Sequence, residues 1–330
     1  MMVQNVLVMG GTHFVGRHLV ERLLQNPNVE LTLFHRGKTN PDLFPDVRHI
    51  WGDRNTADIE QLAKQDWDVV IDFSCYYPRS LKNFVQSLLG HVGRYVFVST
   101  VSVYDTETLP THHTLNEDSP LLSCSLEEEI DHTVYTYGKR KAACERVLVE
   151  YSELNSLIFR PGLIYGPYDP TDRSYYWLWR VQQGHLFLVP DPQIRHQWTY
   201  APDFARILSQ AVSLAEPAHS TYLTLTHDPL SFEQILQAMS EACFKPLPRI
   251  QSVAEEWLTS QGLSYWQDLP LSIPYESLGD CSRLKIDFAP EFSSFKDSWV
   301  QSHAHYEGLG WPEPQTGISV ARETELLALF

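Results

Sequence analysis

The sequence predicts an α/β fold, with a doubly wound parallel sheet and a smaller, mainly helical C-terminal lobe. Short apolar runs rich in β-branched residues alternate with segments of helical periodicity from the first residues onward. The runs are apolar at consecutive positions, as strands covered on both faces are. With 330 residues, 43% of them hydrophobic, the chain is long enough for one large domain and a smaller lobe.

The elements of the sheet are predicted from these runs in order. Apolar runs predict strands over residues 3–9, 31–34, 47–51, 68–73, 95–99 and 157–159. Between them, apolar residues at helical spacing predict helices, the first around Val15, Leu19 and Leu23 and the last over 137–151. Strands that alternate with helices in this way form right-handed crossovers in a parallel sheet.

The chain changes character after the last of these strands. Aromatic residues and prolines become frequent up to Trp198, and short helical stretches broken by prolines follow Thr226. We therefore predict a sheet domain over residues 1–166, with a returning segment at about 199–226. The second lobe would comprise residues 167–198 and 227–330.

Cysteine and histidine spacing argues against disulfides and metal sites. The five cysteines are odd in number, widely scattered and without a C-x-x-C pair. The pairs His303-x-His305 and His112-His113 have no accompanying ligand set, so no metal is expected.

Charge and hydropathy argue against nucleic-acid and membrane partners. Residues 1–100 hold ten basic and ten acidic side chains, whereas the remainder holds 15 basic and 31 acidic ones, for a net charge of −16. That field opposes nucleic-acid binding. No apolar run approaches a membrane span and no signal segment is recognisable, so we expect a cytoplasmic protein without a membrane partner.

A glycine-rich turn lies between the first predicted strand and helix, in the sequence Gly10-Gly11-Thr12-His13-Phe14-Val15-Gly16. Gly10 suits a tight turn, Gly11 lets a pyrophosphate approach the main chain, and Gly16 lets the helix pack closely on the strand. The free N–H groups of the helix then face the phosphates. A flexible connecting loop is the alternative. The turn predicts a Rossmann-type dinucleotide site formed by Gly10, Gly11, Thr12, Phe14, Val15 and Gly16.

The end of the second strand bears on the choice of cofactor. It carries His35-Arg36-Gly37-Lys38 and no acidic residue. This favours NADP over NAD, because a basic side chain can hold the 2′-phosphate. A basic surface loop without a ligand role is the alternative. Asp53 could accept a bond from adenine, or cap a helix that begins near Thr56.

Tyr137 and Lys141 stand four residues apart on one predicted helix and so share a face. A free tyrosine has a pKa near ~10, which a nearby ammonium lowers enough for proton transfer. Lys141 could also hold the cofactor ribose. By itself the pair fits a solvated helix face equally well. The hydroxyl-rich strand end at Ser99, Thr100 and Ser102 strengthens the catalytic interpretation. Thr100 could orient the substrate oxygen, and Ser99 and Ser102 are the alternatives.

Taken together, these motifs resemble the extended short-chain dehydrogenases/reductases, the NAD-dependent epimerase/dehydratase family. The ordered motifs are the glycine turn, Gly52-Asp53, Phe97-Val98-Ser99-Thr100, Tyr137-x-x-x-Lys141, Arg160-Pro161-x-x-x-Tyr165-Gly166-Pro167 and Asp203-Phe204-Ala205. The resemblance covers the first two thirds of the chain well. It implies that Thr100, Tyr137 and Lys141 are catalytic and that residues 161–164 flank the nicotinamide, so Ser74, Pro161 and Ile164 complete the predicted cofactor set. Related enzymes often dimerise, so a homodimer is one expected assembly.

Two departures from the family pattern bear on function. His13 replaces the usual third glycine, as in a divergent branch that includes chloroplast stem-loop RNA-binding proteins. His196 stands where nucleotide-sugar epimerases carry an arginine, and Arg195 is one residue off register. An NAD(P)-dependent oxidoreductase or epimerase acting on a small hydroxyl or carbonyl substrate, such as a sugar or nucleotide sugar, is therefore favoured over a non-catalytic cofactor-sensing or RNA-binding protein.

The predicted substrate contacts are drawn from polar and aromatic residues near the motifs. Rings in the 165–200 region could stack on a sugar, and an arginine could pair with a carboxylate or phosphate. An aromatic interior is the stronger alternative for most of these rings. The residues predicted to contact substrate are Tyr104, Tyr168, Arg173 and Arg195.

Overall fold

The computed structural model describes residues 3–110, 113–184, 187–189, 191–265 and 267–330. The chain folds into two compact units, each assembled from several segments. The first unit comprises residues 1–162, 202–224 and 280–290, and the second comprises 163–201, 225–279 and 291–330. The sequence predicts residues 280–290 to be in the smaller lobe, whereas the structure places them in the first unit.

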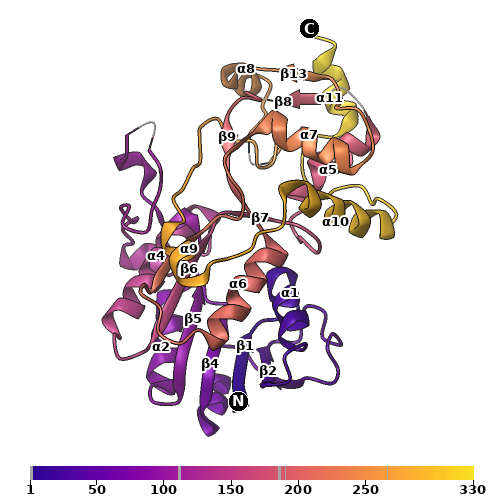
Figure 1. Ribbon diagram of the computed structural model, residues 1–330. Helices are drawn as coiled ribbons and strands as arrows, with labels where there is room; N and C mark the ends of the chain where they lie inside the picture. The colour runs from indigo at the N-terminus through magenta and orange to yellow at the C-terminus, as the bar shows by residue number, and fades with distance from the viewer. Residues whose placement is uncertain (1–2, 111–112, 185–186, 190, 266) are drawn as a thin grey trace. The chain divides into compact units, whose positions relative to one another are not determined.

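The first unit is built on a seven-stranded sheet in the order β11-β6-β5-β4-β1-β2-β3 (Figure 1). Every neighbouring pair in this sheet is parallel. The predicted doubly wound α/β fold is therefore confirmed. The strands are β1 (Gln4–Met9), β2 (Val29–His35), β3 (Arg48–Trp51), β4 (Trp67–Asp72), β5 (Val92–Val98), β6 (Ser156–Pro161) and β11 (Thr221–Thr224).

Successive side chains of a strand point to opposite faces of the sheet, and both sets are apolar here. Helices therefore cover both faces. On one face α2 (Pro78–Leu88) and α4 (Tyr137–Glu150) pack against side chains such as Leu7, Val70 and Phe97. On the other face lie α1 (Phe14–Leu23) and α6 (Ala201–Ser213), where Phe159 contacts Phe204 at 6.2 Å between ring centroids. The predicted returning segment is thus α6 followed by the edge strand β11.

Several short helices connect these elements or lie at the sheet edge. Asp287 fixes helix α9 (Ser282–Phe288) to β11, since its carboxylate accepts hydrogen bonds from the His219 amide at 3.0 Å and the Tyr222 hydroxyl at 2.9 Å. The connecting helices are η1 (Ala57–Lys64), η2 (Val101–Val103), η3 (Thr106–Thr108), α3 (Leu126–Glu129), η4 (Val134–Thr136) and α9 (Ser282–Phe288).

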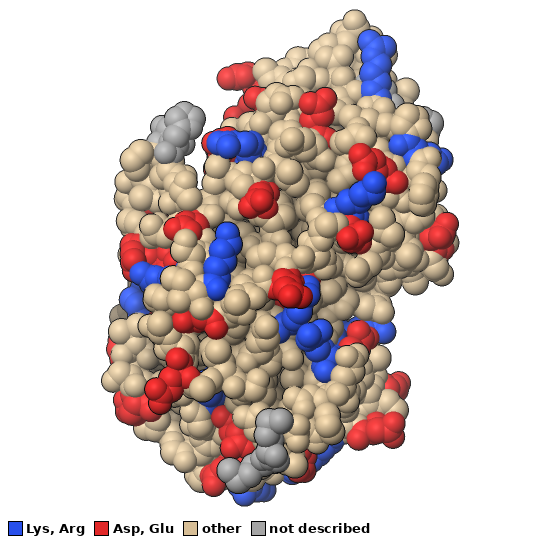
Figure 2. All heavy atoms as spheres, in the orientation of Figure 1, with Lys and Arg blue, Asp and Glu red and all other residues tan. Residues whose placement is uncertain are grey.

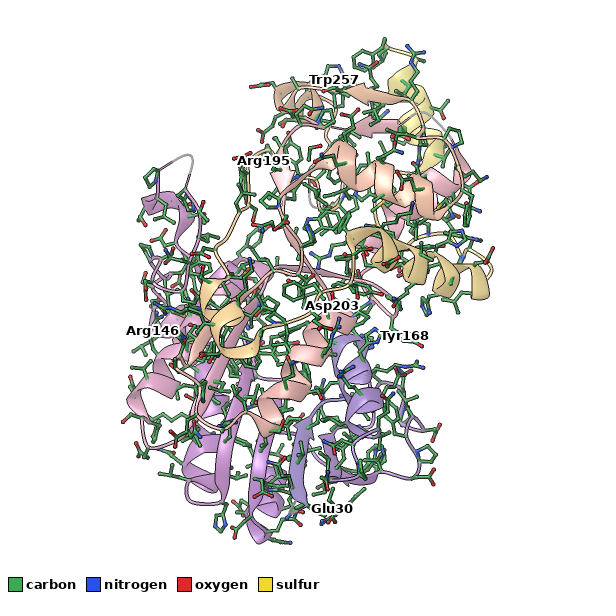
Figure 3. The ribbon with its side chains drawn as sticks, viewed as in Figure 1. Glu30, Arg146, Tyr168, Arg195, Asp203 and Trp257 are labelled. Carbon is green, nitrogen blue, oxygen red and sulfur yellow. The ribbon has the colours of Figure 1, made fainter. Side chains whose placement is uncertain are left out.

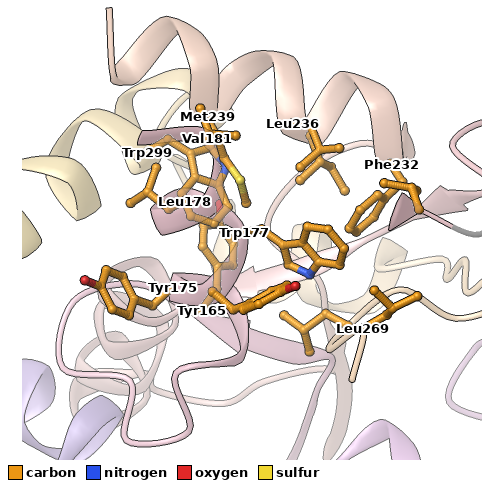
Figure 4. Close-up of a cluster of buried hydrophobic side chains, with 14 of the residues drawn as sticks. Tyr165, Tyr175, Trp177, Leu178, Val181, Phe232, Leu236, Met239, Leu269 and Trp299 are labelled. Carbon is orange, nitrogen blue, oxygen red and sulfur yellow. The ribbon is translucent and has the colours of Figure 1, made fainter. Parts of the chain in front are cut away.

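The second unit is mainly helical and has its own core of aromatic side chains (Figure 4). Tyr165, Trp177 and Trp198 are each no more than 1% exposed, so the dense aromatic residues form an interior, the stronger of the two interpretations. Its helices are α5 (Arg173–Gln183), α7 (Phe232–Ala242), α8 (Glu255–Ser260), α10 (Phe295–Gly308) and α11 (Val320–Leu327). Its strands are β7 (Leu163–Tyr165), β8 (Phe187–Val189), β9 (Arg195–His196), β10 (Trp198–Tyr200), β12 (Leu230–Ser231) and β13 (Ile250–Ser252).

Three further observations concern membrane-spanning helices, metal sites and cysteines among the described residues. None of their helices is long and apolar enough to cross a membrane. No group of three or more His, Cys, Asp or Glu side chains among them could hold a metal ion. The five cysteines are free thiols.

Candidate cofactor and active site

The glycine turn joins β1 to α1 at the carboxyl edge of the sheet. Gly10 and Gly11 have φ angles of +107° and +94°, a left-handed region that side chains rarely enter. A Cβ on Gly11 would meet Leu33 at 3.0 Å, and one on Gly16 would meet the Gly11 Cα at 2.9 Å. Each glycine is therefore required, either by backbone conformation or by close packing of helix on strand.

The first turn of α1 leaves its backbone amides available to an anion. His13, at the N-cap, makes no side-chain capping bond, and Phe14 begins the helix with a strained φ of +39°. The Thr12 hydroxyl donates to the Thr39 carbonyl at 2.8 Å, and the Asn40 amide donates to the Thr12 carbonyl at 2.8 Å. The turn is thus fastened to the loop between β2 and β3, while Val15 is buried beneath it.

Arg36 and Asp53 lie together after β2 and β3. The Arg36 guanidinium is exposed and 3.9 Å from the Asp53 carboxylate. The other oxygen of Asp53 accepts bonds from the amide and side chain of Asn55, both at 3.0 Å. The helix cap is supplied by Thr56 instead, whose hydroxyl accepts from the Asp58 amide at 3.2 Å. The capping alternative for Asp53 is therefore wrong.

Ser74 belongs to a buried ion-pair network at the end of β4. Arg54 donates to both oxygens of Asp72, at 2.8 and 2.6 Å, and to the Ser74 hydroxyl at 3.1 Å. The Tyr95 hydroxyl donates to Asp72 at 2.5 Å. Burial alone would raise the pKa of Asp72, but Arg54 and these hydrogen bonds hold it below the usual value.

Lys141 is buried under the carboxyl edge of the sheet. Its ammonium donates to the Val98 carbonyl at 2.6 Å and the Cys75 carbonyl at 2.9 Å, and lies 3.9 Å from the centre of the Phe97 ring. Burial lowers the pKa of this amine. Tyr137 begins the same helix, half-buried, with its ring centroid 6.2 Å from that of Tyr76.

Thr100 lies at the end of β5 and caps the short helix η2. Its hydroxyl accepts from the Ser102 amide at 3.1 Å and donates to the Ser102 hydroxyl at 3.2 Å. Thr100 is buried and Ser102 is exposed. Ser99, by contrast, donates to Glu145 at 2.5 Å, so its hydroxyl is committed to the helix α4.

Gly138 brings α4 into direct contact with the turn that carries Thr100. A Cβ at this position would lie 2.0 Å from the Ser102 carbonyl oxygen and 3.2 Å from Leu122. No side chain can be accommodated there without moving the backbone. The residue after Tyr137 therefore sets the distance between Tyr137 and the hydroxyl-bearing turn.

The Gly138→Ala variant should be destabilised by about 1–3 kcal/mol, because the new methyl group forces α4 away from the turn. Chemical denaturation would measure the loss. Gly308→Ala is a matched control, since a Cβ there meets nothing within 4 Å, and it should be neutral or slightly stabilising. Equal stability of the two variants would contradict the close contact.

A second buried network joins β6 to α4 through an ion pair between Arg160 and Glu145. The Arg160 guanidinium donates to Glu145 three times, at 3.1, 3.1 and 2.5 Å, and to the Tyr104 hydroxyl at 3.1 Å. Burial raises the pKa of Tyr104 to about 12. Tyr104 is only 3% exposed, so its hydroxyl serves this network. Through Glu145 and Ser99, α4 is joined to the ends of β5 and β6.

The remaining predicted residues divide between the units. Pro161 ends β6 in the first unit, whereas Ile164 lies on β7 in the second. Also in the second unit, Tyr168 packs on His305 at 4.5 Å between rings, and Arg173 binds the Thr171 hydroxyl at 3.1 Å. Figure 3 labels Tyr168 and Arg195.

Arg195 and His196, which depart from the arginine pattern of nucleotide-sugar epimerases, lie in the second unit. Arg195 is paired with Glu276, at 2.6 and 3.1 Å. His196 is buried, and that burial lowers its pKa to about 4, so it is neutral near pH 7. The cationic charge at this position is thus confined to an arginine already held in an ion pair.

Sequence reasoning missed the residues that support the site. Asp72 and Arg160 both stand in apolar strands, and a charge in such a strand needs a buried partner. That pattern could have marked them as members of buried networks. Their partners Arg54 and Glu145 are 18 and 15 residues away and give no local signal. The contacting pair His35 and His49, at 2.8 Å, was also missed.

A glycine turn at the β1–α1 junction of a parallel, doubly wound sheet defines a Rossmann dinucleotide-binding protein. The sequence model of the NAD dependent epimerase/dehydratase family matches residues 6–222. The chain therefore belongs to that family of nicotinamide-dependent enzymes, the extended short-chain dehydrogenases/reductases. The resemblance found in the sequence is confirmed.

Solved structures share the fold. The UDP-glucuronic acid 4-epimerase of Bacillus cereus, solved with NAD, has a TM-score of 0.70 at 16% identity, covering 92% of this chain and 99% of that one. The UDP-glucose 4-epimerase of Thermus thermophilus, also solved with NAD, has a TM-score of 0.69 at 20% identity, covering 92% of this chain and 99% of that one.

Two relatives differ in what their names say they do. The chloroplast stem-loop binding protein of 41 kDa b from Arabidopsis thaliana is 23% identical over 75% of this chain. The match spans only 65% of that protein's length. The N-acetyl-α-D-glucosaminyl-diphospho-ditrans,octacis-undecaprenol 4-epimerase of Escherichia coli O157:H7 is 22% identical over 75% of each chain.

Proposed function

We propose that this protein is an NAD(P)-dependent oxidoreductase or epimerase that acts on a hydroxyl or carbonyl carbon of a sugar or nucleotide sugar. The observation that carries the proposal is the contact of α4 with the Thr100–Ser102 turn, which brings the helix bearing Tyr137 and Lys141 against a hydroxyl-rich strand end. Kinship with 4-epimerases supports the substrate class.

The glycine turn fits the pyrophosphate of a dinucleotide. A side chain at Gly11 would meet Leu33, and the uncapped first turn of α1 offers N–H groups and the positive end of the helix dipole. The first unit would therefore hold the cofactor through Gly10, Gly11, Thr12, Phe14, Val15 and Gly16. When bound, NAD(P) supplies a centre that accepts and returns a hydride.

The chain's own residues supply the proton chemistry. The Tyr137 phenolate would take the proton of a substrate hydroxyl as the carbon is oxidised, and the resulting phenol would return it on reduction. The buried Lys141 ammonium favours the phenolate electrostatically, and two carbonyl acceptors fix its position. Thr100 would orient the substrate oxygen, while Ser74 and Tyr104 support the site through their networks.

The experiment that tests this function has two stages. Calorimetric titration with NAD⁺ and NADP⁺ should reveal micromolar binding, and incubation with a panel of UDP-sugars should then yield the 4-epimer or a keto product, detected by NMR. Failure to bind either dinucleotide at millimolar concentration rules the proposal out. Binding without turnover on any sugar would favour a cofactor-sensing protein instead.

NADP is the preferred cofactor in this proposal, because the exposed Arg36 follows β2 where the adenosine 2′-phosphate would lie. Arg36→Ala should weaken NADP⁺ binding about ten- to a hundred-fold, since it removes a charged hydrogen bond, and should leave NAD⁺ binding nearly unchanged. Calorimetry would measure both constants. Arg48→Ala, which removes an exposed guanidinium bonded to Gln65, should change neither. Equal losses for both dinucleotides would contradict a contact between Arg36 and the 2′-phosphate.

Contacts to the substrate are proposed for Tyr168 and Arg173 of the second unit, which carry an aromatic ring and a guanidinium suited to a sugar and a phosphate. The ion pair between Arg195 and Glu276 makes Arg195 a weaker candidate. A homodimer is also proposed. Light scattering at micromolar protein would test it.

RNA binding is the second candidate, favoured by the likeness to the stem-loop binding protein. The net charge of −16 opposes it. On the face drawn in Figure 2, acidic and basic side chains of the described residues are interspersed. Gel-shift titration at physiological salt distinguishes the candidates, because tight RNA binding without dinucleotide binding would support this one.

A further inference from the structure

A chain of hydrogen bonds crosses the loop between β2 and β3 through two histidines. The Gly37 amide lies 3.2 Å from His35 Nδ1, His35 Nε2 lies 2.8 Å from His49 Nδ1, and His49 Nε2 lies 3.1 Å from the Phe44 carbonyl oxygen. His35 ends β2 and His49 lies on β3. Gly37 and Phe44, at the two ends of the chain, both belong to the loop of residues 36–47.

The chemistry of these groups allows one arrangement of protons. A backbone amide only donates, so His35 Nδ1 accepts and its Nε2 carries the hydrogen. That hydrogen is donated to His49 Nδ1, and His49 Nε2 then donates to a carbonyl, which only accepts. Every bond is satisfied when both imidazoles are neutral. A proton added at His35 Nδ1 or His49 Nδ1 removes an acceptor and breaks the chain.

The loop that the histidines hold needs such support. Gly37, Asn40 and Phe44 all have left-handed backbones, with φ angles of +69°, +44° and +64°. For Asn40 and Phe44 that conformation is costly and persists only where the surroundings impose it. The Trp51 ring also packs against the loop. Its centroid lies 5.3 Å from that of His49, on which it stacks, and a Cβ on Gly37 would lie 2.7 Å from the Trp51 ring.

The same loop touches the cofactor site at two places. It begins with Arg36, proposed above to hold the 2′-phosphate, and it is tied to the glycine turn by the Thr39 and Asn40 bonds to Thr12, both 2.8 Å. A change in loop conformation therefore alters the position of a charge at the adenosine end and the backbone beside the pyrophosphate.

The surroundings of His35 favour its neutral form. Burial lowers the pKa of His35 below its usual 6.5, and repulsion from a charged His49 lowers it further. Nearby charged groups have partners of their own: Arg36 with Asp53, Arg48 with Gln65 and Arg17 with Glu21. The other titratable groups on the glycine turn, α1, β2 and the loop are His13, His18, Arg22, Glu30, Lys38, Asp42 and Asp46. The hydrogen-bond chain is therefore intact at neutral pH, and it is lost as the pH falls through the lowered pKa of His35.

We propose that His35 and His49 are positioning residues of the cofactor site, which hold the 36–47 loop through neutral imidazoles and weaken dinucleotide binding when they are protonated. The inference rests on the proposed function, because it assigns the adenosine end of NADP to this loop. It adds a pH dependence of binding that Arg36 and the glycine turn do not provide.

The test compares dissociation constants for NADP⁺ of the full chain and its His49→Phe variant between pH 7.5 and 5.0. Phe preserves a ring against Trp51 but removes both nitrogens. The variant should bind about ten-fold more weakly at pH 7.5, from the loss of two hydrogen bonds. The ratio of the two constants should fall toward one at pH 5.0. Taking the ratio cancels titration of the 2′-phosphate, which has a pKa near ~6.

His91→Phe is the matched control, because this exposed histidine pairs with Asp66 away from the loop, and its ratio should stay near one throughout. His35→Phe provides the same comparison if His49→Phe does not fold. A ratio for the His49 variant that is constant with pH overturns the inference while leaving the proposed function intact. Absence of NAD⁺ and NADP⁺ binding at every pH overturns both.

Discussion

The Tyr137→Phe variant is expected to lose about 10²- to 10⁴-fold in turnover and to bind NADP⁺ within about two-fold of the wild type. The substitution removes the hydroxyl that exchanges the substrate proton, the contribution that a positioned general acid or base makes. It retains the ring that faces Tyr76. Turnover would be measured on the sugar identified by the UDP-sugar panel, and binding by calorimetry.

The control for this variant is Tyr135→Phe, which removes a hydroxyl two residues earlier from a side chain that is 89% exposed. It should retain full turnover. A Tyr137→Phe protein with the wild-type rate would remove Tyr137 from the mechanism. A parallel loss of rate and of cofactor affinity would mean that the ring holds the dinucleotide instead.

The Glu145→Gln variant is expected to unfold at markedly lower denaturant, with a loss of about 3–5 kcal/mol, because it leaves the buried Arg160 guanidinium without its counter-charge. Glutamine has nearly the same shape and can still accept the bond from Ser99. The effect therefore reports the charge rather than a cavity. Hydrogen exchange of amides in α4 and β6 would measure it locally.

Glu21→Gln is the matched control, since it neutralises a half-exposed partner of Arg17 within the same unit. It should cost no more than about 0.5 kcal/mol, the usual value of an i,i+4 pair on a helix surface. If both variants unfold at the same denaturant concentration, the pair between Arg160 and Glu145 does not stabilise the first unit.

Most of the sheet could be predicted from the sequence because its signal is local. Buried parallel strands are apolar at consecutive positions, so runs such as 68–73 and 95–99 mark β4 and β5 with shifts of one to three residues. The small ladders of the second unit could not be found this way. The β9–β12 pair has two residues on each side, too few for a pattern.

The candidate site likewise contains residues that local spacing reveals and residues that only the fold brings together. Tyr137 and Lys141 lie one helical turn apart, and the glycine turn is contiguous, so spacing alone points to them. Arg54 with Asp72, Glu145 with Arg160, and His35 with His49 are joined only by folding. Their roles depend on which strands become neighbours, and a single sequence does not report that directly.

The discontinuous make-up of the first unit has a consequence for biosynthesis. Its edge strand β11 pairs with β6 only after some 60 intervening residues, and α9, held by Asp287, belongs to the same unit. A nascent chain emerging from the ribosome must therefore expose the flank of β6 until β11, which ends at Thr224, has emerged, and the unit is complete only after residue 290. Fragments that stop at residue 162 would leave that flank unpaired and prone to self-association.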